Sequence, residues 1–192
     1  MSEQVPDSLS NPSPPAMRWR LWVDGCGGFL LLGGDAWSVG AVSHCDSADI
    51  GVRADWPRLA GQIRRQDDDY LWIESASSNP VLISDGQTLP IPGSAAMTLT
   101  KPSPLCRSAR LNLSPPHRFA DHMDGVVLVA DALLIGPDSD CHIRTGGVED
   151  RIVLTRRNTD WLARVGLTGE FTQLSIGNRL TFPSLTMTLE TA

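Results

Sequence analysis

Apolar and polar residues alternate over short stretches along most of this chain. Residues 18–23, Arg-Trp-Arg-Leu-Trp-Val, are the first such stretch, and a period of two is typical of a β-strand with one buried face. Turns rich in glycine and aspartate follow at 24–28 and 33–35. No window shows a convincing helical period, so the pattern predicts an all-β chain. The expected strands of the first half are 18–23, 29–32, 37–40, 62–66, 70–74, 80–83 and 96–100.

The pattern occurs twice, which indicates an internal repeat. Residues 35–40, Asp-Ala-Trp-Ser-Val-Gly, are matched by 131–136, Asp-Ala-Leu-Leu-Ile-Gly. Residues 70–73 are matched in the same way by 161–165. The spacing between the copies shrinks along the chain, as expected when a second copy has shorter loops. The second copy predicts strands at 126–130, 132–136, 142–144, 151–155, 161–165, 171–174, 179–182 and 185–190.

The repeat and the proline-rich stretches divide the chain into four parts. Residues 1–17 form a leader that has neither the basic start nor the apolar core of a signal peptide, and we interpret it as disordered. A first module at 18–100 and a second, shorter one at 125–192 flank a partly ordered connector at 101–124. The connector begins with Lys-Pro-Ser-Pro, but its alternating residues 109–113 predict a strand that joins one of the sheets.

Composition narrows the class of protein. The net charge of −6 argues against nucleic-acid binding, which needs a basic face. No apolar stretch is long enough to span a membrane as a helix. Four cysteines occur without Cys-x-x-Cys spacing, which predicts reduced thiols and a cytoplasmic protein.

The order of the short motifs resembles the forkhead-associated (FHA) domain, and the two modules are similar to the tandem, degenerate FHA modules of planctomycete-type bacterial proteins. The resemblance covers about residues 18–190. It implies two β-sandwiches packed in tandem, a SMAD/FHA-like fold, in a family whose well-known members bind phosphothreonine peptides through loops at one end. The motifs that carry it are Val39-Gly40, Ala48-Asp49-Ile50, 58–63, 70–73, Ser78-Asn79, Asp85-Gly86 and 89–93.

The phosphate-binding residues of the family are mostly absent. Its Gly-Arg pair falls on Gly40-Ala41, and its Ser-Arg-x-His motif falls on 57–60, Pro-Arg-Leu-Ala. Arg58 and Asn79 remain, while Gly136 of the second module is followed by a proline. Phosphate recognition needs several converging charge-assisted donors, so the resemblance predicts the fold better than the activity.

These observations predict a non-catalytic protein-protein interaction module, or signalling scaffold, that binds its partner independently of phosphate. The alternatives are weak phosphothreonine-peptide binding by the first module and a structural unit that forms homo-oligomers. The partner would be a protein, possibly phosphorylated, with no nucleic acid, membrane, cofactor or metal. Trp56 is either a contact residue or a lid on the core. The candidate peptide contacts are Arg53, Trp56, Arg58, Ser78 and Asn79.

The sequence gives weaker support for a metal site or a catalytic site. His44-Cys45 and Cys141-His142 follow the equivalent glycines and could form a zinc site, the basis of a metal-hydrolase alternative, but they belong to separate modules. His117 with Asp121, His122 and Asp124 could form a metal site or an acid–base pair, and Asp67-Asp68-Asp69 could bind calcium. We instead interpret the first group as the polar residues expected in a connector, and the three aspartates as a solvated hairpin turn before Tyr70. Four tryptophans are expected to pack in the core: 22, 37, 72 and 161.

Overall fold

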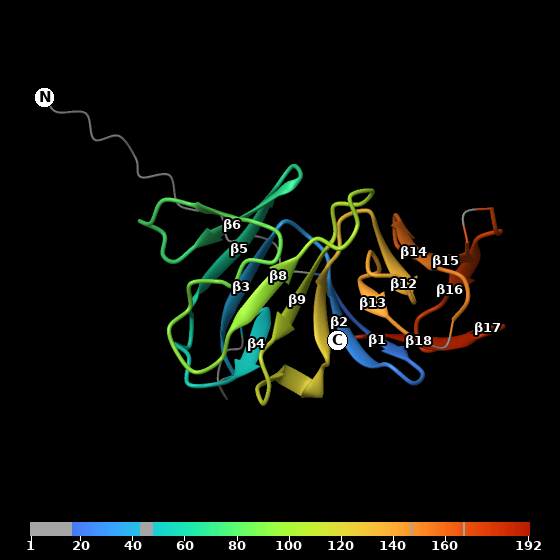
Figure 1. Cartoon of the computed structure of the whole chain (residues 1–192), viewed down its shortest axis with the longest axis horizontal. Coiled ribbons are helices and arrows are strands. Elements are labelled where there is room, and N and C mark those ends of the chain that lie inside the picture. Colours follow the sequence, from blue (N-terminus) through green and yellow to red (C-terminus); the bar gives the residue numbers. More distant parts are fainter. Residues whose placement is uncertain (1–16, 43–47, 147, 167) are drawn as a thin grey trace, which may run out of the picture.

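The computed structural model describes residues 17–42, 48–146, 148–166 and 168–192, and it shows an all-β protein built from three mixed sheets (Figure 1). Within these ranges there is no α-helix, and one 3-10 turn, η1, covers Ala120–His122. No helix of the described residues is long and apolar enough to cross a membrane. The all-β prediction from the alternating pattern is therefore confirmed.

The largest sheet has seven strands and runs through the middle of the molecule (Figure 1). Its order is β17-β18-β1-β2-β11-β9-β8. The central strands β2 and β11 run parallel, while β1 pairs antiparallel with β2 and β9 pairs antiparallel with β11. The strands are β1 (Arg18–Val23), β2 (Gly27–Leu32), β8 (Met97–Thr100), β9 (Ala109–Leu113), β11 (Gly125–Leu128), β17 (Arg179–Phe182) and β18 (Leu185–Thr191).

Two smaller sheets contain the two copies of the repeat. The first has the order β10-β4-β3-β5-β6-β7 and the second the order β13-β12-β14-β15-β16. The first comprises β3 (Ala36–Ala41), β4 (Ile50–Arg53), β5 (Gly61–Gln66), β6 (Asp69–Ile73), β7 (Val81–Ile83) and β10 (Arg118–Phe119). The second comprises β12 (Ala132–Gly136), β13 (Ile143–Arg144), β14 (Ile152–Arg157), β15 (Asp160–Val165) and β16 (Thr172–Leu174).

The order and direction of the strands agree between the two smaller sheets. Strand β3 pairs in parallel with β4 and antiparallel with β5, and β12 pairs in parallel with β13 and antiparallel with β14. Strands β6 and β7 correspond in the same way to β15 and β16. The internal repeat read from the sequence is thus present in the sheet topology.

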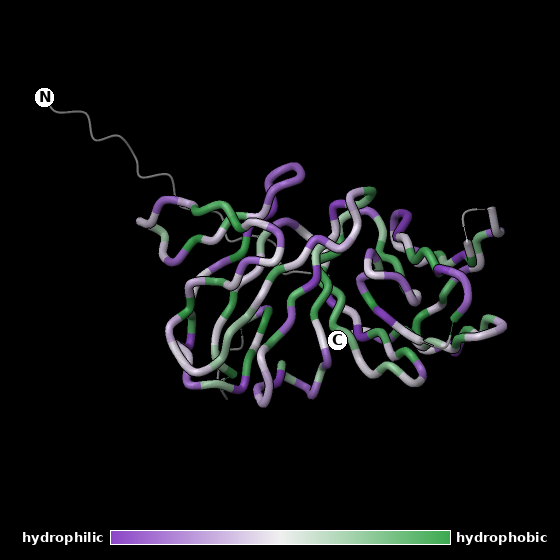
Figure 2. Tube along the Cα trace, in the orientation of Figure 1, coloured by the Kyte–Doolittle hydropathy of each residue, from purple (hydrophilic) through white to green (hydrophobic). Residues whose placement is uncertain are grey.

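Strand β2 is buried on both faces because it lies between two hydrophobic cores. Leu30 and Leu32 belong to core 1, which the six-stranded sheet covers. Phe29 and Leu31 belong to core 2, which the five-stranded sheet covers. Figure 2 shows the hydrophobic segments that gather around this strand in the middle of the molecule. A near-continuous apolar run is what a strand covered on both faces requires.

Each core combines residues from both sides of the connector. The inward-facing residues of β1, Trp19, Leu21 and Val23, pack in core 2, where β1 pairs with β18. Those of β9, Ala109 and Leu111, pack in core 1, where β9 pairs with β8. The connector does contribute a strand, as the alternation of 109–113 predicts. The division expected from the sequence, in which 18–100 pack together, differs from these contacts because β1 joins core 2.

The tryptophans test the expected burial patterns of the strands. Trp37, Trp72 and Trp161 are buried, as predicted. The prediction for Trp22 is wrong, because this residue is 38% exposed. It lies on the face of β1 opposite Leu21, and its indole N–H donates to the carboxylate of Glu190 at 2.9 Å.

Candidate functional site

Two loops meet at one end of the six-stranded sheet. Loop 54–60 joins β4 to β5, and loop 74–80 joins β6 to β7. Strands β4 and β6 both end there, while β5 and β7 begin there. The predicted contact residues Arg58, Ser78 and Asn79 lie in these loops. Arg53 is exposed at the end of β4 opposite Arg118 of β10, on the side of the sheet away from β7.

The backbone of loop 54–60 lies directly against β3. The Ala41 N–H donates to the Pro57 carbonyl at 3.0 Å, and the Ala60 N–H donates to the Val39 carbonyl at 2.8 Å. A Cβ atom built on Gly40 would be only 2.0 Å from the Arg58 carbonyl oxygen. Glycine is therefore required at position 40 by close packing of two backbones.

Trp56 is part of core 1. Its side chain is 6% exposed, and its indole N–H donates to the Ala95 carbonyl at 3.2 Å. A Cβ atom on Gly93 would lie 2.7 Å from the indole ring, so the 90–96 segment packs closely over it. Of the two roles left open by the sequence, the structure places Trp56 in the core, where it supports the loop that carries Arg58.

Ser78 and Asn79 differ in exposure. Ser78 is half-buried in a turn in which its N–H donates to the Ser75 carbonyl at 3.0 Å. Its hydroxyl lies 2.8 Å from the hydroxyl of Ser75. Asn79 is exposed. Ser78 therefore shapes the loop, while the side chain of Asn79 is accessible to a ligand.

Loops 54–60 and 74–80 border a groove of about 570 Å³, here called the apical groove. Its lining includes Leu59, Gln62, Arg64, Ile73, Ser78 and Pro80. Leu59 is 64% exposed at the rim of the groove. The groove carries one arginine and one carboxylate, Arg64 and Glu74, so it has no excess of positive charge.

Strand β7 continues this surface from Pro80 and forms one edge of the six-stranded sheet. Val81 and Leu82 are 53% and 52% exposed. An edge strand presents backbone donors and acceptors that no neighbouring strand uses. Apolar side chains on such an edge are a liability that soluble proteins usually avoid.

The second repeat supplies an internal comparison for this edge. Tyr70 pairs with Ile83 and Leu71 with Leu82 in the first repeat, whereas Trp161 pairs with Leu174 and Leu162 with Gln173 in the second. The buried position is apolar in both repeats. The exposed positions are valine and leucine in β7 but Thr172 and Gln173 in β16. The sequence does contain this difference, but it becomes visible only once the register is known.

Asp55, Ser94 and His117 form a polar cluster near the same loops. The Ser94 hydroxyl donates to the Asp55 carboxylate at 2.6 Å and lies 3.0 Å from Nε2 of His117. Nδ1 of His117 lies 3.3 Å from the Ser114 carbonyl. Hydrogen bonds from the Ser94 side chain and backbone lower the pKa of Asp55 below 3.8. In a hydrolytic triad the histidine separates serine from aspartate. Here the serine is in the middle, so the cluster links three segments and does not activate a nucleophile.

The metal hypotheses find no support in the geometry. Within the described ranges, no three His, Cys, Asp or Glu residues are close enough to hold an ion. His44-Cys45 lies outside the described residues. In the group around His117, Asp121 pairs with Arg20 at 2.7 Å, and Asp124 accepts from the Gly28 N–H at 3.0 Å. Residues 67–68 form the turn of the β5–β6 hairpin, which agrees with the interpretation of the three aspartates as a hairpin turn.

His142 is a buried residue that connects the two halves of the molecule. Its Nδ1 accepts from the Leu134 N–H at 3.1 Å, and its Nε2 lies 3.1 Å from the Ser108 carbonyl. The Cys106 sulfur is 3.4 Å from Nε2, which the sequence did not suggest. Burial raises the pKa of the Cys106 thiol, opposite to the lowering that a nucleophilic cysteine needs.

Comparison with known proteins finds no family model that matches the chain, no similar curated protein and no similar solved structure. The function must therefore be argued from the apical groove and the β7 edge.

Proposed function

We propose that this chain is a non-catalytic protein-interaction module that binds an extended segment of a partner protein along β7 and the apical groove. The observation that carries the proposal is the exposed pair Val81 and Leu82 on an edge strand. Their counterparts in the second repeat are polar. The first repeat is thus adapted for binding at an edge that the second repeat protects.

Strand addition explains the chemistry of this surface. A peptide that pairs with β7 satisfies the backbone groups of the edge, and its alternate side chains contact the groove. Leu59, Val81 and Leu82 provide apolar area, and each buried side chain of this kind contributes roughly 1.5 to 3 kcal/mol. The partner segment is therefore extended and carries apolar residues at alternate positions.

Phosphate is not needed in this mode of binding. Arg64 and Glu74 balance each other in the groove, and the serine and histidine of the family's phosphate motif are Pro57 and Ala60 here. From the FHA resemblance we propose a fold of two FHA-like sandwiches in tandem with degenerate recognition loops. We also propose that the protein is a scaffold located in the cytoplasm. Weak phosphothreonine binding through Arg58 and self-association through β7 are the competing functions.

The test is selection of unphosphorylated twelve-residue peptides from a random display library on the full chain, followed by calorimetric titration of the selected peptides. The double variant Val81→Thr/Leu82→Gln gives the first repeat the edge residues of the second. We expect it to weaken peptide binding by about tenfold or more, because two apolar contacts are lost. The matched control, Thr172→Ala/Gln173→Ala, changes the equivalent edge and should leave affinity unchanged.

Three results would overturn the proposal. One is failure to select any peptide, and another is equal affinity of the two double variants. The third is binding that requires phosphothreonine and is lost in Arg58→Ala, which would establish the phosphopeptide function. A change of mass in solution in Val81→Thr/Leu82→Gln, without peptide binding by the wild type, would instead show that β7 pairs with a second copy.

A further inference from the structure

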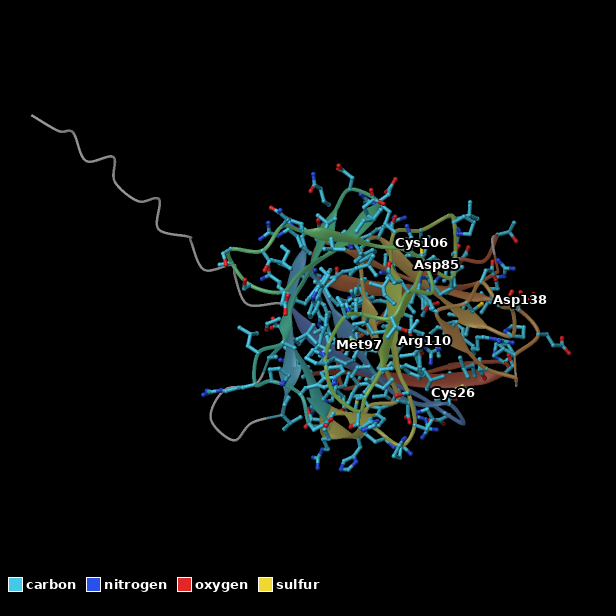
Figure 3. All side chains as sticks on the ribbon, turned by 60° about the vertical axis from the view of Figure 1, so that its left-hand side comes forward. Cys26, Asp85, Met97, Cys106, Arg110 and Asp138 are labelled. Carbon is cyan, nitrogen blue, oxygen red and sulfur yellow. The ribbon has the colours of Figure 1, made fainter. Side chains whose placement is uncertain are left out.

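A second surface depression lies where the two repeats meet. We call it the seam cleft, and it has a volume of about 470 Å³. It is bordered by β8 and β9 on one side and by residues around β13 on the other. Its lining includes the polar residues Asp85, Lys101, Arg110, Asn112, Ser139 and Arg144. Figure 3 views this face and shows Arg110 between Asp85 and Cys26, near the middle of the molecule.

Arg110 extends from β9 across the seam. One of its terminal nitrogens donates to the His142 carbonyl at 2.8 Å, and its guanidinium carbon lies 5.5 Å from the centre of the Phe29 ring. Its Nε is buried and has no hydrogen-bond partner among the described residues. Burial lowers the pKa of Arg110, and the positive charge of Arg144 also contributes to this lowering. Both Arg110 and Arg144 line the seam cleft.

Neither Arg110 nor Arg144 forms a salt bridge with a carboxylate in the part of the chain that the structure describes. Several other arginines of the protein are paired with aspartates. The paired arginines are Arg20, Arg65, Arg107, Arg118, Arg151 and Arg179. The Asp124 carboxylate also lies near enough to favour the charged form of Arg110, and a bound anion would add a further negative charge beside the two arginines of the cleft.

The charge of the cleft also favours an anion. The lining of the cleft contains the cations Lys101, Arg110 and Arg144 and the carboxylate of Asp85, and the Lys101 ammonium also donates to the Asp68 carbonyl at 3.4 Å. One oxygen of Asp85 already accepts from the Lys101 backbone N–H at 2.6 Å. This excess of positive charge in the lining occurs on a chain whose net charge is −6. Asn112 and Ser139 add neutral polar groups that can donate to an oxyanion.

We propose that the seam cleft binds a phosphate group through Arg110 and Arg144. The planar guanidinium group donates two parallel hydrogen bonds to phosphate oxygens, and the two excess positive charges match a phosphate dianion. The group comes either from inorganic phosphate or from a phosphorylated ligand. This site is separate from the apical groove, and it contacts residues of both repeats, so occupancy would strengthen the seam.

The test is titration of the full-length protein with inorganic phosphate and with O-phosphothreonine, followed by calorimetry and by the midpoint of thermal unfolding. Potassium chloride at the same ionic strength controls for screening. We expect saturable binding and a rise in the unfolding midpoint, since a ligand that binds the folded state stabilises it. Tighter binding of phosphothreonine would identify a phosphorylated side chain as the source, and equal binding would identify the phosphate group alone.

Arg144→Gln is the informative variant because Arg144 is exposed and its replacement should not disturb folding. We expect it to weaken phosphate binding by about tenfold or more, the effect of losing a charge-assisted interaction. Arg110→Lys keeps the charge but loses the planar guanidinium group with its parallel donors, so this variant should also bind phosphate more weakly. Arg53→Gln removes an exposed charge elsewhere and should leave affinity unchanged, as should Val81→Thr/Leu82→Gln. Absence of saturable binding, or equal affinity of Arg144→Gln and Arg53→Gln, would refute the site.

Discussion

Single residues in this protein are constrained most strongly where separate segments of backbone meet. Gly40 lies against the Arg58 carbonyl, and a Cβ there would require loop 54–60 to move. The repeat places Gly136 at the equivalent position, where a Cβ would lie 3.2 Å from the Cys141 sulfur. The sequence marks both positions as glycine, but the neighbour that excludes a side chain belongs to the tertiary structure.

We predict that Gly40→Ala destabilises the protein by about 1 to 3 kcal/mol, the usual cost of inserting atoms into a packed site. Chemical denaturation monitored by tryptophan fluorescence measures the change. Gly146→Ala is the matched control, because nothing lies within 4 Å of a Cβ at that position, and it should shift stability by no more than about 0.5 kcal/mol. Similar losses in the two variants would show that the close approach at Gly40 does not matter.

Burial of His142 makes stability depend on pH. Burial lowers the pKa of His142 below 6.5, and the nearby charge of Arg110 acts in the same direction. Nδ1 accepts from the Leu134 N–H, so a proton there would also break a hydrogen bond. The unfolded chain then binds a proton more readily than the folded one, and stability rises with pH. The contribution is fully present above pH 6.5 and is lost as the pH falls below it.

We predict that the free energy of unfolding decreases between pH 7.5 and 5.5, as measured by urea denaturation across that range. His142→Gln should reduce the pH dependence, although it should also lower stability at pH 7.5 because the hydrogen bonds change. His122→Gln, which alters an exposed histidine, should retain the wild-type dependence. A profile that is unchanged in His142→Gln would assign the pH effect to another group.

Individual elements show how strand alternation divides one strand between two cores. Consecutive residues of β2 point to opposite faces, so Leu31 packs in core 2 and Leu32 in core 1, both with no exposed surface. Strand β11 does the same with Val127 and Leu128. Because these two strands are neighbours in the seven-stranded sheet, each core contains residues from both repeats.

We predict that Leu31→Ala and Leu32→Ala each cost about 2 to 5 kcal/mol but weaken different parts of the molecule. Hydrogen exchange measures this, because amide protection reports local opening. Leu31→Ala should reduce protection mainly in β15, and Leu32→Ala mainly in β6. The two neighbouring positions control for each other in chemistry and burial. Equal loss of protection in both strands in both variants would mean that the cores open as one unit.

At the scale of the whole molecule, the two repeats form one continuous structure through the shared seven-stranded sheet. The N-terminal strand β1 and the C-terminal strand β18 pair across the chain, while β8 and β9 pair across the connector. This arrangement leaves an apolar edge at β7 and places Arg110 and Arg144 in the lining of one cleft at the seam. The two proposed binding surfaces therefore lie in different places and do not share residues.

Local periodicity made much of the fold predictable. The strands at 18–23, 37–40, 62–66 and 179–182 were located within a residue or two, because alternation and turn residues act over a few positions. The prediction that Trp22 is buried is wrong, because which face of β1 is buried depends on the sheet that covers it. Among the expected contacts, Arg58, Ser78 and Asn79 are found in two neighbouring loops, whereas Trp56 is in the core.

The sequence by itself determined the all-β class, the internal repeat and the net acidic charge, because each follows from residue type and local spacing. Only the tertiary structure decided that β1 joins core 2, that β7 is an exposed apolar edge and that Arg110 and Arg144 line one cleft at the seam. The physical reason is that alternation specifies which side chains share a face of a strand. Which sheet packs against that face depends on the free energy of the whole sheet arrangement, and therefore on contacts between residues far apart in the chain.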